Sequence, residues 1–213
     1  MSCYLKPREM EIINNHYNKY FTMAGAKPSG IVIHQNKDDG IHIDIEHYLP
    51  TDEFPYHIFA TVGMSAYKMK NVPHKRIELI MFLPRDWKTD EQSLKYDEWS
   101  WPINLLLNTA CMPYQCNSCL SYAHTISYSD EFSPFANCTE MCCGLVTFPT
   151  YLDHGIFNLT YGILPHKKVN FYCLTTITKE EFDKSLIMGR SEFIENELSK
   201  NKKEDDLVVR NYR

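Results

Sequence analysis

The chain has 213 residues, which suits one sizeable domain or at most two small ones. Hydrophobic residues make up 44% of the chain and aromatic residues 13%, so the composition predicts a packed core and excludes a disordered protein. The formal net charge of −5 disfavours nonspecific attraction to nucleic acid or to anionic membranes, and it favours a basic partner.

Neither end of the sequence nor its apolar stretches indicate export or membrane insertion. The first residues, MSCYLKPREMEI, lack the basic and apolar regions of a signal peptide, and the longest apolar stretch, IELIMFLP, is too short to span a bilayer. We therefore expect a soluble, cytoplasmic protein. Its eight cysteines should then remain thiols, which leaves metal binding open.

The N-terminal half predicts a helix followed by strands. Between Arg8 and Met23 apolar side chains recur at helical spacing, after a proline where a helix can begin. Alternation of apolar and polar residues then predicts strands at 31–34, 40–50, 56–64 and 75–84. Together these segments predict an antiparallel sheet.

The C-terminal half alternates between the two periods. A helical stripe at 97–112 should pack on the sheet, with Pro102 in its first turn, and Thr178 and Glu181 stand at the spacing of a capping box that begins a later helix. Further strands are predicted at 123–129, 143–150 and 167–177, and further helices at 178–189 and 191–200. The strand at 167–177 carries bulky residues on both faces, as a central strand does.

The order of these elements predicts a single α+β domain over residues 8–200. Residues 201–213, NKKEDDLVVRNYR, are charged and are predicted to form a solvated or mobile C-terminal tail. We find no internal repeat and no linker rich in glycine, serine or proline.

A cluster of cysteines is the first candidate for chemistry. A Cys-x-x-Cys pair is followed after eighteen residues by a Cys-x-x-x-Cys pair, a spacing loosely compatible with a zinc ribbon. That site would use Cys116, Cys119, Cys138 and Cys142, with Cys143 or His124 as a substitute ligand. The flanking residues lack the short glycine-rich or lysine-rich knuckles of such sites, so we favour reduced cysteines that pack as small hydrophobes and no bound metal.

A second polar group lies on one predicted strand. His42, Asp44 and Glu46 share a face and could form an acid/base or metal cluster, but alternation with three isoleucines favours a plain solvent face. The sequence contains no phosphate-binding loop, dinucleotide fingerprint, nucleophile elbow or His-Glu-x-x-His motif. These patterns predict neither a catalytic residue nor a cofactor.

Aromatic residues near acidic ones indicate a surface for a protein partner. The candidate contact residues are Trp99, Trp101, Tyr128, Asp130 and Glu131. Aromatic anchors inside an acidic rim suit a basic protein partner. The alternative is that the two tryptophans only lock the start of a helix into the core.

Several segments in order resemble the suppressor-of-fused domain family, especially its single-domain bacterial members. The segments are ATVGMSAYKM, RIELIMFLP, WPINLLLNTA, AHTISYSDEFSPF, GLVTFPT and VNFYCLTTITKEEFDKSLIMGRSEFI. The resemblance covers about residues 8 to 200. It implies an α+β fold like the N-terminal lobe of suppressor of fused, with a mainly antiparallel or mixed sheet packed with helices, and protein binding without catalysis.

Bacterial members of this family resemble immunity proteins, or antitoxins, that neutralise a polymorphic toxin encoded beside them, often a nuclease. The resemblance therefore implies a cognate toxin as partner, and the acidic net charge favours a basic one, with no direct binding of nucleic acid or membrane. Two alternatives remain open, a zinc-dependent protein built on the cysteines and a peptide-binding adaptor that uses a sheet edge. The sequence departs from the family at Ala123, where a glycine commonly stands, and in its cysteine cluster.

Overall fold

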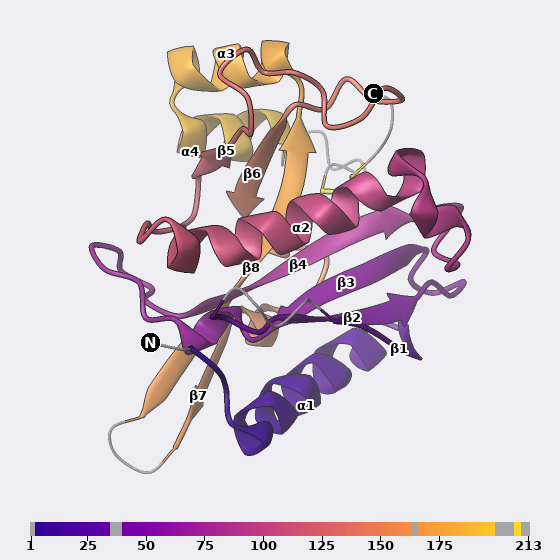
Figure 1. The fold of residues 1–213 in the computed structure, drawn as a ribbon, viewed down its shortest axis with the longest axis vertical. Coiled ribbons are helices and arrows are strands. Elements are labelled where there is room, and N and C mark those ends of the chain that lie inside the picture. The colour runs from indigo at the N-terminus through magenta and orange to yellow at the C-terminus, as the bar shows by residue number, and fades with distance from the viewer. Residues whose placement is uncertain (1–2, 35–39, 163–165, 199–206, 210–213) are drawn as a thin grey trace.

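The computed structural model describes residues 3–34, 40–162, 166–198 and 207–209 (Figure 1). Its strands are β1 (Lys27–His34), β2 (Asp44–Leu49), β3 (Tyr56–Val62), β4 (Ile77–Pro84), β5 (Thr125–Ile126), β6 (Cys143–Thr147), β7 (Asn158–Tyr161) and β8 (Lys167–Ile177). Its helices are α1 (Pro7–Met23), α2 (Asp97–Gln115), α3 (Lys179–Met188) and α4 (Arg190–Phe193), the last continued by a π-helical turn at Ile194–Leu198. In the described part of the chain, no helix is both long and apolar enough to cross a membrane.

All strands belong to one mixed sheet. Its order is β1-β2-β3-β4-β8-β6-β5, and β7 forms a hairpin with β8 beside this path. β1 to β4 form an antiparallel meander, whereas β4 and β8 run parallel, with Ile77 opposite Asn170. β8 pairs with β4, β6 and β7, so the prediction of a central strand and the prediction of an α+β fold are both confirmed.

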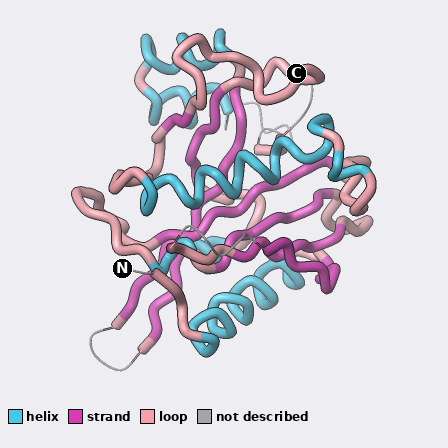
Figure 2. The backbone as a smooth tube through the Cα atoms, in the orientation of Figure 1, coloured by secondary structure: helices cyan, strands magenta, loops and turns pink. Residues whose placement is uncertain are grey.

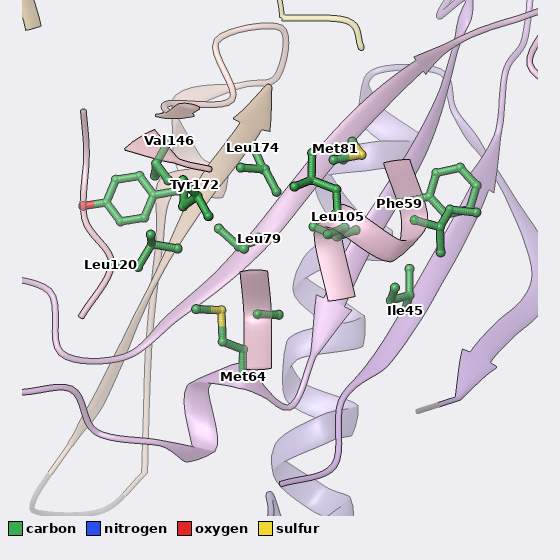
Figure 3. Packing of buried hydrophobic residues seen from close by; sticks show 14 of the residues in the cluster. Ile45, Phe59, Met64, Leu79, Met81, Leu105, Leu120, Val146, Tyr172 and Leu174 are labelled. Carbon is green, nitrogen blue, oxygen red and sulfur yellow. The ribbon is translucent and has the colours of Figure 1, made fainter. Parts of the chain in front are cut away.

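Helices cover the two faces of the sheet, α1 on one and α2 on the other, as Figure 2 shows. The core between the sheet and α2 includes Ile45, Phe59, Leu79 and Met81 from the strands and Leu105 from the helix (Figure 3). Each such side chain contributes roughly 1.5–3 kcal/mol when it is fully buried. Since β3 and β4 are covered on both faces, nearly all of their residues are buried, rather than every second one.

The opposite face packs against α1. Tyr17 and Phe21 of the helix lie against Phe171 and Tyr48 of the sheet, with ring centroids 5.3 Å apart for Tyr17 and Phe171 and 4.8 Å apart for Phe21 and Tyr48. The Tyr17 hydroxyl donates a hydrogen bond of 2.8 Å to the backbone oxygen of Thr61. These contacts fix α1 on the strands and confirm the predicted amphipathic first helix.

A third, smaller core lies at the β5 and β6 end of the sheet, beneath α3 and α4. It includes Cys142, Cys143 and Ile177, together with Phe193 from α4. The predicted capping box is present, because the Thr178 hydroxyl accepts from the backbone of Glu181 and the Glu181 carboxylate accepts from the backbone of Thr178. The helix after β8 therefore begins where the sequence predicts.

The polar face of β2 is not a solvent face, so that prediction is wrong. Asp44 is only 6% exposed and lies 3.0 Å from the Nε2 of His42. The Asn14 side chain of α1 donates to Glu46. The residues alternate between the two faces as predicted, but Glu46 lies against α1 and Asp44 is buried.

Several boundaries differ from the sequence prediction, and two of the differences have a structural reason. Strand β5 has two residues instead of the expected 123–129, since Ala123 adopts a positive φ of 62° and turns begin soon after Ile126. Pro102 lies inside α2 rather than in its first turn, because the helix begins at Asp97. The short helix predicted at 191–200 is α4 with the π-helical turn, and its last two positions lie outside the described residues.

Part of the predicted tail is packed against the sheet. Leu207, Val208 and Val209 are buried, and Val208 forms a parallel bridge with Phe82 of β4. The expectation of a solvated tail is therefore wrong for these three residues: Leu207 and Val208 extend the core next to α1, and Val209 extends the core next to α2. The rest of that expectation, at 201–206 and 210–213, lies outside the described residues.

Candidate protein-binding surface

Trp87, which follows β4, anchors the start of α2. Its ring lies edge-to-face with Trp99 and with Trp101, at centroid distances of 5.4 and 6.2 Å. Its indole N–H donates to the backbone oxygen of Trp99 at 2.9 Å. Trp101 is 4% exposed and Trp99 is half-buried, so Trp101 serves packing while Trp99 also reaches solvent.

The segment after β5 folds onto the same helix. Phe135 stacks on Trp101 at 5.7 Å and meets Tyr128 edge-to-face at 6.1 Å. The Tyr128 hydroxyl lies 3.0 Å from the Thr109 hydroxyl of α2, and partial burial raises the pKa of Tyr128 to about 12. Its ring is nevertheless 50% exposed, so this tyrosine is a fixed aromatic group that solvent still reaches.

Exposed acidic residues stand next to these aromatic residues in the sequence. Asp97 and Glu98 are exposed in the first turn of α2, and Asp130 and Glu131 are exposed in the loop beside Tyr128. We call the following set the aromatic-acidic surface: Tyr96, Asp97, Glu98, Trp99, Tyr128, Asp130 and Glu131. The ammonium of Lys88 lies 5.0 Å from the centre of the Trp99 ring.

The structure connects the three aromatic contact residues, Trp99, Trp101 and Tyr128, through the rings of Trp87 and Phe135. Tyr96, which directly precedes α2, is 67% exposed.

The cysteines do not form a common site. Cys116 is exposed at the end of α2, Cys119 and Cys138 pack against the core under α2, and Cys142 belongs to the third core. Among the described residues, no group of three or more His, Cys, Asp or Glu side chains is placed to hold a metal ion. Burial raises the pKa of Cys143 to about 12, which makes that thiol a poor ligand or nucleophile.

A buried carboxylate organises the turn after β3. Glu78 of β4 is completely buried, and it accepts from the Thr61 hydroxyl at 2.7 Å and from the backbone N–H of Gly63 at 3.0 Å. It also accepts from the backbone N–H and the hydroxyl of Ser65, at 3.0 and 2.6 Å. Burial raises the pKa of Glu78, while the four donated hydrogen bonds act in the opposite direction because they stabilise the carboxylate.

The same turn requires a glycine. Gly63 has a φ of 131°, and a Cβ at this position would lie 2.2 Å from the backbone oxygen of His42. From the outer side, the Arg76 guanidinium donates to the backbone oxygens of Ser65 and Ala66 at 2.6 and 2.7 Å. Sequence reasoning noted the Gly-Met-Ser segment and the glutamate strand only as family resemblances, and did not predict that they bond to each other.

The sheet covered by α1 and α2 defines a single α+β domain, and comparisons identify its family. Residues 39–209 match the model of the family described as suppressor of fused protein (SUFU). The chain therefore belongs to the suppressor-of-fused family. A search of curated protein sequences finds no match.

Solved structures show the same fold at low sequence identity. The crystal structure of a putative SUFU homologue from Neisseria gonorrhoeae has a TM-score of 0.66 at 13% identity, and the match covers 96% of each chain. A structure of the Sufu-Fu complex has a TM-score of 0.62 at 15% identity, covering 95% of this chain and 89% of the other. Drosophila Suppressor of Fused has a TM-score of 0.60 at 15% identity, and the match spans 97% of this chain but 52% of that one.

Proposed function

We propose that this protein is a non-enzymatic immunity protein, or antitoxin, that binds and neutralises a cognate toxin. The observation that carries the proposal is the aromatic-acidic surface, which presents rings held by other rings, with exposed acidic residues next to them in the sequence. Family membership supports a protein-binding role, since one similar structure is that of the Sufu-Fu complex.

The geometry of the surface suits tight binding. Tyr128 and Trp99 are already held by contacts with Phe135 and Trp87, so little side-chain freedom is lost when a partner covers them. Amphipathic rings of this kind often contribute most of the binding energy at an interface. Here Tyr128 offers an apolar ring face together with a hydroxyl, and Trp99 offers one together with an indole N–H.

The charge of the surface suits a basic partner. Asp97, Glu98, Asp130 and Glu131 are all exposed, and opposite charges accelerate association of two proteins. A nuclease toxin carries basic residues where it holds the phosphate backbone, so an acidic protein can occupy that site in place of nucleic acid. Inhibition then follows from blocking access, with no catalysis by this chain.

Co-expression with the product of the adjacent reading frame tests the proposal. We expect the neighbour alone to stop growth, and growth to recover when this chain is present. The double variant Asp130→Asn with Glu131→Gln should protect less well, because it removes the two acidic charges beside Tyr128. The matched control is Glu11→Gln with Glu180→Gln, which removes two exposed charges from α1 and α3.

The two variants separate the role of the surface from the role of net charge. Full protection by the control and impaired protection by the Asp130 and Glu131 variant are expected. A neighbour that is harmless, or that stays toxic in the presence of this chain, contradicts the immunity function itself. Equal protection by both variants contradicts the assignment of the surface.

A further inference from the structure

A basic pocket lies away from the aromatic-acidic surface, where the loop before β4 meets the β7-β8 hairpin. The hairpin extends from the body of the fold at the lower left of Figure 1. The cavity has a volume of about 350 Å³. We call it the basic pocket and define it by Lys68, His74, Lys75, Arg76, Lys167 and Lys168.

The walls of the basic pocket are held by backbone hydrogen bonds. The N–H of Asn170 in β8 donates to the backbone oxygen of Arg76 at 3.0 Å, and the N–H of Met69 donates to that of Lys75 at 2.8 Å. The first bond ties the loop to the hairpin, and the second closes the loop on itself. The basic side chains therefore project from backbone that is already in place, which lowers the entropy cost of binding.

The guanidinium of Arg76 is fixed as well. It donates to two backbone oxygens of the turn after β3, so its position does not depend on a ligand. Lys167 pairs with Glu9 of α1, whereas Lys75 and Lys168 are exposed. The basic pocket thus combines an anchored arginine with lysines that solvent reaches.

The charge of the basic pocket is opposite in sign to the net charge of the whole chain. Five Lys and Arg residues line it, and among its described lining residues there is no carboxylate, although the chain has a net charge of −5. Lys168 also contributes, after burial, to the lowered pKa of His74, which indicates a positive local field. Like charges gathered in a concave site repel one another, and a bound anion relieves that repulsion.

We propose that the basic pocket binds a small polyphosphate anion. Several cations around one cavity match a ligand that carries several charges, and arginine and lysine are the side chains that bind phosphate. A cavity of about 350 Å³ accepts a few linked phosphate groups but not a nucleic-acid duplex. Because no Phe, Tyr or Trp is among its described lining residues, recognition is of the phosphates and not of an attached base.

Calorimetric titration of the purified chain with inorganic tripolyphosphate at low salt tests the proposal. We expect saturable binding to one site, weakening as salt is added because counterions compete for the lysines. Lys75→Gln with Lys168→Gln should weaken binding by about tenfold or more, since two of the five cations are lost. Both lysines are exposed, so these substitutions should leave the fold intact.

Control measurements assign the binding to this site and to this chemistry. Lys19→Gln with Lys27→Gln removes the same charge from exposed positions on α1 and β1 and should change the affinity by less than about twofold. ATP should bind as tightly as tripolyphosphate, and citrate more weakly. The proposal is overturned by absence of saturable binding, by equal losses in the two double variants, by much tighter binding of ATP, or by equal binding of citrate.

Discussion

Removing the carboxylate of Glu78 is expected to destabilise the protein strongly. Its two oxygens accept four hydrogen bonds, two from backbone N–H groups and two from hydroxyls, at a position with no exposed surface. In Glu78→Ala the hydroxyls of Thr61 and Ser65 can rotate toward other acceptors. The backbone N–H groups of Gly63 and Ser65 cannot turn away without moving the chain.

The magnitude follows from these two backbone groups. A buried donor that loses its acceptor costs roughly 1–3 kcal/mol, so two of them cost about 2–6 kcal/mol in the free energy of unfolding. The loss in Glu78→Gln should be smaller, because the amide keeps one oxygen as an acceptor and avoids the cost of a buried charge. We therefore expect wild type to be most stable, then the glutamine variant, then the alanine variant.

Urea denaturation followed by circular dichroism measures these differences as shifts in the midpoint. Glu11→Ala is the matched control, since this glutamate is exposed on α1 and its loss should change stability by less than about 0.5 kcal/mol. If Glu78→Ala unfolds within about 1 kcal/mol of wild type, the two N–H groups have found other partners, and the role given to Glu78 is refuted.

Three other predictions concern the turn, the histidines and the thiols. Gly63→Ala should lower the free energy of unfolding, measured by urea denaturation, by about 2–3 kcal/mol because of its positive φ and the close backbone oxygen. Gly30→Ala, whose Cβ would meet no atom within 4 Å, should lower it by about 1 kcal/mol. Equal losses in the two variants would contradict this. Burial lowers the pKa of His47 to about 4, so below pH 6.5 the unfolded chain binds more protons than the folded chain does. The free energy of unfolding should therefore fall by up to about 3 kcal/mol between pH 6.5 and pH 4. A urea midpoint that stays constant over that range would argue against a buried neutral histidine. In the native protein a thiol reagent should label the exposed Cys116 well before the buried Cys143, as followed by mass spectrometry. Labelling of both cysteines at the same rate would disprove the burial of Cys143.

Elements that are specified by residues close together in the sequence could be predicted from it. The strand β8 carries large side chains on both faces because it is buried on both sides, and α3 begins at a capping box formed by residues three positions apart. The resemblance to the suppressor-of-fused family also rested on short segments in order. It was confirmed by the family match over residues 39–209.

Features that join distant segments were not predictable in this way. The alternation in β2 gave the correct two faces, but nothing near Glu46 in the sequence indicates that Asn14 of α1 bonds to it. The four donors to Glu78 come from the end of β3 and the turn after it, more than ten residues away. The lysines and the arginine of the basic pocket come from segments as far apart as Lys68 and Lys168, so no short stretch of the sequence predicts its charge.

The aromatic-acidic surface lies between these cases. The sequence placed aromatic and acidic residues near the start of α2 and near Tyr128, but only the fold brings the two segments together through Phe135. It also separates Trp101, which is buried, from Trp99, which is partly exposed. Whether Trp99 or Trp101 is buried depends on which side of α2 faces the sheet. The spacing of apolar residues in the sequence did not decide between the two tryptophans.

The most direct test of the proposed function is calorimetric binding of the purified chain to the purified product of the adjacent reading frame. Tyr128→Ala removes a ring that is 50% exposed on the aromatic-acidic surface, and Tyr4→Ala removes one that is 49% exposed near the N-terminus. The proposed function predicts saturable binding that Tyr128→Ala weakens by about tenfold or more and Tyr4→Ala leaves within about twofold. No binding by the wild-type chain would contradict the proposed function.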